Sequence, residues 1–102
     1  MLPKELKFVL YNDKIYIAYV KSNYIRFKVF FDLKELKSAK NLNFELLNRL
    51  IQFDVPRDIN KINVIVDEDF YFKSYSFHFL KKYFKKAKVE YMTTNFLAYL
   101  HI

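Results

Sequence analysis

Several nucleotide-binding and catalytic motifs cannot be written into this sequence, because its 102 residues contain no glycine. The P-loop, the dinucleotide-binding fingerprint, the nucleophile elbow and the EF-hand loop each need glycine at fixed positions. Turns with a positive φ must instead use asparagine or aspartate, which tolerate this conformation best after glycine. Asn12, Asp13 and Asn23 lie where such turns are expected.

Cysteine is also absent, so neither a disulfide bond nor a thiolate metal site can form. His78 and His101 lack the spacing of zinc motifs, and we interpret both as surface residues without a metal role. The longest uncharged stretch, residues 91–102, is too short to cross a bilayer. We therefore expect a soluble, intracellular protein that uses no cofactor and does not enter a membrane.

Apolar residues are plentiful, at 53% of the chain with 21% aromatic, which is enough for the core of one domain spanning residues 1–102. Alternation of apolar and polar residues predicts three strands, at 7–11, 15–20 and 24–31, the first two joined by a tight turn at Asn12 and Asp13. In the third strand, one face carries alternating aromatic and basic side chains, namely Tyr24, Arg26, Lys28 and Phe30.

Two helices are expected to follow these strands. Asp32 and Glu35 resemble a capping box that opens a short helix with inward-facing Leu33, Leu36 and Ala39. Asn43 is expected to cap a second helix, whose apolar stripe is Phe44, Leu47 and Ile51, flanked by Leu46 and Leu50.

The second half begins after a polar linker, residues 54–60, that contains Pro56. We predict a strand at 62–66, a solvated acidic turn at 67–69 and a returning strand at 70–73. Ser74 is expected to cap a helix over 75–87, with an apolar stripe of Phe77, Leu80, Tyr83, Phe84 and Ala87. Residues 89–92 are interpreted as a strand or a helical extension, and Thr93 or Thr94 as the cap of a short terminal helix.

The two halves share one order of elements, which predicts a degenerate internal repeat. Unit one covers about residues 14–53, preceded by an extra N-terminal strand at 6–11, and unit two covers about residues 61–102. The predicted fold class is α+β, with the two hairpin-plus-helix units packed as a pseudo-twofold pair around one core. Such a pair leaves a groove along its seam, where a ligand or peptide segment can lodge.

Charge is distributed unevenly in a chain whose net charge is +7. Residues 73–88 hold six lysines and no acid, whereas residues 54–69 hold five acids. Lysines on one helix face can neutralise nucleic-acid phosphates, and they are also typical of any solvated helix face. The candidate phosphate contacts are Lys81, Lys82, Lys85, Lys86 and Lys88.

No pair of residues predicts catalysis, and we do not expect an enzyme. Glu35 and Glu45 are explained by capping and by a polar helix face, and the cluster Asp67, Glu68 and Asp69 lacks the spacing of a calcium loop. Twenty-one aromatic residues, nine tyrosines and twelve phenylalanines, exceed what a small core can hide, which favours a protein or peptide partner. The candidate partner contacts are Tyr24, Arg26, Lys28, Phe30 and Tyr71.

Over its full length, from MLPKELKFVLYNDKIYIAYV to TTNFLAYLHI, the chain resembles the orphan proteins of Acidianus filamentous virus, a virus of hyperthermophilic archaea. The resemblance implies a viral protein made in the host cytoplasm, or associated with the virion. It carries no functional motif, so no catalytic or binding residues transfer from it.

These patterns together predict a non-enzymatic interaction protein, monomeric or homodimeric, that holds a viral or host peptide segment between its repeats. The alternative is sequence-nonspecific nucleic-acid binding through the lysine-rich helix face.

Overall fold

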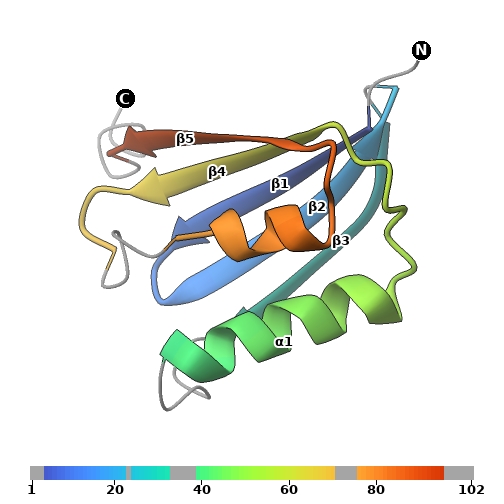
Figure 1. Ribbon diagram of the computed structural model, residues 1–102. Coiled ribbons are helices and arrows are strands. Elements are labelled where there is room, and N and C mark those ends of the chain that lie inside the picture. Colours follow the sequence, from blue (N-terminus) through green and yellow to red (C-terminus); the bar gives the residue numbers. More distant parts are fainter. Residues whose placement is uncertain (1–3, 23, 33–38, 71–75, 96–102) are drawn as a thin grey trace.

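A five-stranded mixed sheet with strand order β3-β2-β1-β4-β5 organises the chain (Figure 1). The computed structural model describes residues 4–22, 24–32, 39–70 and 76–95. The strands are β1 (Lys4–Tyr11), β2 (Lys14–Lys21), β3 (Tyr24–Asp32), β4 (Lys61–Asp67) and β5 (Lys88–Thr94). The helices are α1 (Ala39–Gln52) and the short 3-10 helix η2 (His78–Lys82). No helix in these ranges has the length and apolar character needed to span a membrane.

β1 is the central strand, and its two neighbours run in opposite directions. It pairs antiparallel with β2, from Lys4 opposite Lys21 to Tyr11 opposite Lys14. It pairs in parallel with β4, from Glu5 beside Lys61 onward. β3 extends the sheet antiparallel to β2, and β5 extends it parallel to β4. The structure is therefore one α+β domain, as predicted.

The tight turn between β1 and β2 is confirmed. Asn12 and Asp13 have φ values of 53° and 59°, so both central residues adopt the left-handed conformation of a type I′ hairpin turn. In the next turn Ser22 has a φ of 54°, a conformation that glycine usually adopts. Asn23, predicted for a positive φ in this turn, lies outside the described residues.

One face of the sheet forms the core. Alternate residues of β1, β2 and β4 point to this face, and all of them are buried: Leu6, Phe8, Leu10, Ile15, Ile17, Tyr19, Ile62, Val64 and Val66. The same cluster includes residues of α1 and of the segment around η2, so both helices cover this one face (Figure 1). The rings of Phe8 and Phe77 lie 5.0 Å apart between their centroids, which joins the sheet to that segment.

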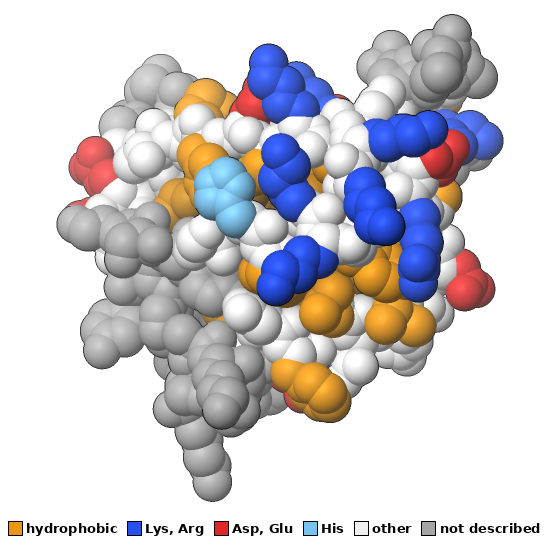
Figure 2. Space-filling view, viewed as in Figure 1, with side chains coloured by type: hydrophobic (Ala, Val, Ile, Leu, Met, Phe, Trp, Pro, Cys, Tyr) orange, Lys and Arg blue, Asp and Glu red, His pale blue; other side chains and the backbone are white. Residues whose placement is uncertain are grey.

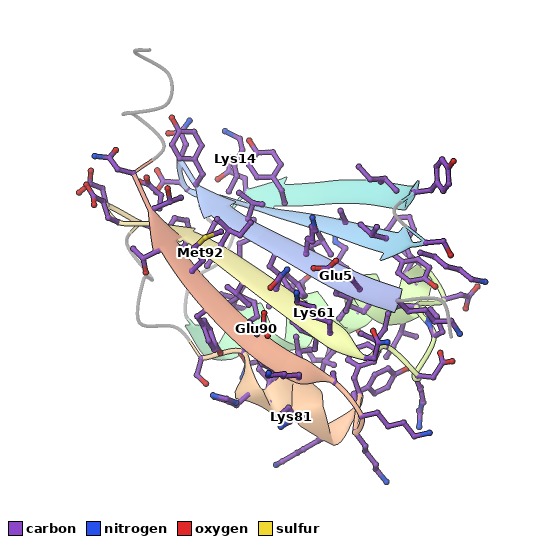
Figure 3. The ribbon with its side chains drawn as sticks, turned by 90° about the horizontal axis from the view of Figure 1, so that it is seen from above. Glu5, Lys14, Lys61, Lys81, Glu90 and Met92 are labelled. Atoms are coloured by element: carbon purple, nitrogen blue, oxygen red, sulfur yellow. The ribbon has the colours of Figure 1, made fainter. Side chains whose placement is uncertain are left out.

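The opposite face of the sheet carries polar pairs that link β1, β4 and β5 (Figure 3). The side-chain amide of Asn63 donates a hydrogen bond to Glu5. Lys61 Nζ lies 3.5 Å from Glu90 Oε2, and Figure 3 shows Glu5, Lys61 and Glu90 on the side of the sheet away from Lys81.

The apolar stripe predicted for α1 is only partly correct. Leu47 packs partly buried against the core and the flanking Leu46 and Leu50 are buried with Leu42, but Phe44 and Ile51 are 66% and 52% exposed. The helix begins at Ala39, so Asn43 lies inside it and is not its cap. Two apolar stripes overlap in this sequence, and the stripe with three leucines at a spacing of four residues packs on the sheet. The shorter helix predicted to precede it lies mostly outside the described residues.

The helix predicted over residues 75–87 is reduced to η2 and the turns that follow it. The N–H groups of Tyr83 and Phe84 both donate to the carbonyl of Leu80, at 3.0 and 2.8 Å, and no α-helix continues from there. The apolar stripe is nevertheless confirmed, since Phe77, Leu80, Phe84 and Ala87 are buried and Tyr83 is partly buried. Burial at these spacings is therefore achieved without an α-helix.

The predicted pair of repeats is not shown. β2 and β3 form an antiparallel hairpin, whereas β4 pairs only with parallel strands, β1 and β5. Residues 89–92 belong to β5, which also includes Thr93 and Thr94. The predicted returning strand and the terminal helix lie almost entirely outside the described residues.

Leu46→Ala is expected to lower the free energy of unfolding by about 2–5 kcal/mol, because it leaves a cavity between α1 and the sheet. Phe44→Ala, which truncates a larger but exposed side chain, should change it by less than about 0.5 kcal/mol. Urea denaturation measures both variants. Equal losses, or a larger loss for Phe44→Ala, would contradict this assignment of the buried face.

Candidate nucleic-acid interface

Five exposed lysines gather on the segment that contains η2 and leads into β5. Figure 2 shows basic side chains concentrated over this part of the molecule. Lys81 and Lys82 end η2, Lys85 and Lys86 lie in the turn after it, and Lys88 begins β5. We call this set the lysine surface; its members are Lys81, Lys82, Lys85, Lys86 and Lys88.

The buried stripe explains why these lysines face solvent. Phe77, Leu80, Phe84 and Ala87 are all at most 3% exposed and fix one side of the segment against the core. The charged residues between them must then project outward, because burying an unpaired ammonium group costs far more free energy than packing of this segment gains. Phe77 is held further by its N–H group, which donates to the hydroxyl of Tyr91 at 2.8 Å.

Most of the lysine surface carries uncompensated charge. Lys88 Nζ lies 3.6 Å from Glu90 Oε1, but this carboxylate is shared with Lys61. Within the described ranges the other four lysines form no ion pair. The ammonium groups of Lys81, Lys82, Lys85 and Lys86 therefore face solvent without an ion pair among the described residues, whereas Lys88 pairs with Glu90 on the sheet face away from Lys81.

Next to the lysine surface, a hollow of about 290 Å³ is lined by Arg57, Asp58, Tyr83, Lys85 and Lys86. We call it the Arg57 hollow. The guanidinium carbon of Arg57 lies 4.4 Å from the centroid of the Tyr83 ring, within range of a cation–π contact. Arg57 was not among the predicted contacts, because it belongs to the linker that we interpreted only as a boundary between halves.

The single acid in the Arg57 hollow is already paired. Lys4 Nζ lies 2.5 Å from Asp58 Oδ2 and donates a hydrogen bond to it. This hydrogen bond lowers the pKa of Asp58 and raises the pKa of Lys4. The carboxylate thus stays ionised and is directed to Lys4, which leaves Arg57, Lys85 and Lys86 as an excess of positive charge.

Asn60 holds this linker beside the lysine surface. Its N–H group donates to the carbonyl of Lys4 at 3.1 Å, and its own carbonyl accepts from the N–H group of Lys88 at 3.1 Å. Its side-chain Oδ1 also accepts from the N–H group of Lys4 at 3.3 Å. The residues just before β4 are therefore tied to the starts of both β1 and β5.

A second hollow, of about 250 Å³, lies where β1 and β4 end. It is lined by Tyr11, Asn12, Asp13, Asp67, Asp69 and Phe70. Asp67, predicted to lie in a solvated turn, is only 6% exposed, and its Oδ2 accepts from the N–H group of Asp69 at 3.3 Å. This carboxylate therefore braces the turn. In the described part of the chain no three potential ligand side chains are grouped so as to hold a metal ion.

The candidate partner contacts are only partly placed. Tyr24 is 71% exposed at the start of β3, an edge strand. Arg26, Lys28 and Phe30 follow it along β3, but their side chains, like Tyr71, lie outside the described part. Tyr24 lines neither hollow. His78 is exposed, as predicted, whereas His101 lies outside the described residues.

Comparison with known proteins bears on the fold alone. No family model matches the chain, and no curated protein matches it, so the viral resemblance stays a prediction. A solved structure from Bacteroides thetaiotaomicron VPI-5482, described as a protein with actin-like ATPase fold and unknown function, is similar with a TM-score of 0.55 and 13% identity. The match covers 86% of this chain and 32% of that protein, so the chain spans about a third of its length.

The Lys4–Asp58 pair makes a pH-dependent contribution to stability. Because the folded-state pKa of Asp58 is lowered, its contribution is present above the unfolded pKa and is lost as the pH falls through the folded value. Lys4→Met should return the pKa of Asp58 toward its ordinary value, as measured by NMR titration of its carboxyl carbon. Lys7→Met removes an exposed lysine elsewhere and serves as the control. An unchanged Asp58 titration in Lys4→Met would refute this pairing.

Proposed function

We propose that this protein binds nucleic acid through the lysine surface, without reading its sequence. The observation that carries the proposal is the exposure of five lysines on one segment, four of them without an ion pair in the described part of the chain. Each such ammonium group that contacts a phosphate releases a condensed counterion, and this release drives binding at low salt.

The residue type supports contact with phosphates rather than with bases. Lysine is a flexible point charge, whereas readout of a base edge favours the planar fork of arginine or an amide side chain. The lysine surface follows a short 3-10 helix and a turn, and it lacks a long helix of the kind that enters a major groove. We therefore expect similar affinity for different sequences of equal length and charge.

We do not propose ATP hydrolysis for this chain, although the description of the Bacteroides protein names an actin-like ATPase fold. The edge where β1 and β4 end is lined by Asp13, Asp67 and Asp69, and its described lining offers no cationic side chain to a polyphosphate. The chain also has no glycine from which to build a loop of backbone N–H groups around phosphates.

The double variant Lys81→Gln/Lys82→Gln should weaken binding to a labelled oligonucleotide by about 25- to 60-fold near 0.1 M salt, because it removes two contacts that each contribute about 0.7 (single strand) to 0.9 (duplex) to the salt slope. Fluorescence anisotropy with single- and double-stranded oligonucleotides, at several salt concentrations, measures the affinity and the slope. The magnitude of the salt slope for duplex DNA should fall by about 1.8, the contribution of two contacts.

The matched control is Lys7→Gln/Lys21→Gln, which removes the same charge from β1 and β2. If both double variants weaken binding equally, net charge alone is responsible and the lysine surface is not the site. Absence of binding by the wild-type protein at low salt would end the proposal.

As a second candidate, we propose that the edge of β3 binds an extended peptide. Tyr24 and Ile25 are 71% and 54% exposed there, which offers apolar contact beside an edge whose main chain can pair with one more strand. Arg26 and Lys28 lie on the same strand and favour a guest with acidic residues. This proposal keeps the predicted partner contacts but does not need a groove between repeats.

Peptides selected from a displayed library against the protein test this second candidate. They should be rich in apolar and acidic residues, and the variant Tyr24→Ser/Ile25→Ser should bind them at least about tenfold more weakly. The control Phe44→Ser/Ile51→Ser removes two exposed apolar side chains from α1 instead. Unaltered binding by the Tyr24→Ser/Ile25→Ser variant would exclude this edge as the docking site.

A further inference from the structure

We propose that the Arg57 hollow is a binding site for one phosphate group, with Arg57 as the residue that fixes its position. The inference rests on the proposed nucleic-acid function and names the point at which the strand is held in place. Three of the five described lining residues are cationic, namely Arg57, Lys85 and Lys86. The lysines belong also to the lysine surface, so the hollow is continuous with it.

The geometry of Arg57 prepares it for a phosphate. Its guanidinium carbon lies 4.4 Å from the centroid of the Tyr83 ring, which restricts the group and reduces the side-chain entropy lost on binding. The ring of Tyr83 is in turn held against Phe84, with centroids 4.9 Å apart and planes at 80°. Because Phe84 is fully buried, this chain of contacts connects an exposed guanidinium group to the core.

The charge of the hollow stays positive despite its carboxylate. Asp58 accepts its hydrogen bond from Lys4 at 2.5 Å, and among the described residues it forms no ion pair with Arg57, Lys85 or Lys86. A phosphate that enters the hollow therefore meets three cations, Arg57, Lys85 and Lys86, and one carboxylate whose charge is already neutralised by Lys4. A bidentate contact with the guanidinium group, supported by two ammonium groups, is the chemistry that this arrangement favours.

The size of the hollow is compatible with a phosphate and part of the group attached to it. Its volume is about 290 Å³ and it is open to solvent. The phosphate can come from the interior of a strand, from a strand end, or from free inorganic phosphate. These sources share the same chemistry, and the experiment must separate them.

Arg57→Gln and Arg57→Lys are the test variants, with Lys7→Gln as a control of equal charge change. Arg57 is exposed, so these substitutions should leave the folded state intact, which thermal unfolding checks. The probes are a single-stranded oligonucleotide with a 5′-hydroxyl, the same strand with a 5′-phosphate, and inorganic phosphate followed by NMR shifts of the residue 83–88 amides. Arg57→Gln should weaken oligonucleotide binding about five- to eightfold near 0.1 M salt, the loss of one contact.

Arg57→Lys keeps the charge but lacks the planar fork, so it should recover less than half of that loss on a logarithmic scale. A stronger effect of Arg57→Gln with the 5′-phosphorylated strand identifies a strand end as the source, and an equal effect on both strands identifies an internal phosphate. Shifts caused by inorganic phosphate that vanish in Arg57→Gln support the site even if no oligonucleotide binds, in which case the proposed function alone fails. If Arg57→Gln behaves like Lys7→Gln with every probe while Lys81→Gln/Lys82→Gln weakens binding, the phosphate site in the Arg57 hollow is refuted, and nucleic-acid binding by the lysine surface is retained.

Discussion

The parallel pairing of β1 with β4, closed at one end by Asn60, is the constraint on which the remaining structure depends. Asn60 bonds to Lys4 through both its backbone and its side chain, and its carbonyl accepts from Lys88. Three strand starts are thereby brought together from residues far apart in the sequence. The linker that carries Arg57 and Asp58 lies beside the lysine surface because this junction holds it there, so the basic site follows from sheet topology.

The local features of this fold were readable from sequence, and the long-range ones were not. Alternating residues revealed β1 and β2, and the pair Asn12 and Asp13 revealed their turn, because each signal depends on neighbouring residues only. The parallel partners of β4 left no such local sign. An antiparallel hairpin and a parallel crossover can have the same order of apolar runs, which explains how the chain resembled two repeats that the sheet does not show.

The same division applies to the candidate site. The lysine surface was predicted because its residues are close in sequence and alternate with a buried stripe, and the stripe was correct although the α-helix was not. Arg57 and Asp58 were missed because their partners, Tyr83 and Lys4, lie more than twenty residues away. In α1, two apolar stripes overlap, so the periodicity of the sequence alone does not show whether Phe44 or Leu46 faces the core. The position of the sheet determines that Leu46 is buried.

The central place of β1 has a consequence for how the chain is made. β1, β2 and β3 are contiguous in sequence and can form a meander once residue 32 has left the ribosome, since all their pairings are local. Glu5 and Lys61 are 56 positions apart, so the other edge of β1 waits for a partner that emerges much later. During that interval an apolar strand edge is open to other nascent chains, and the rate at which β4 arrives limits how long the hazard of aggregation lasts.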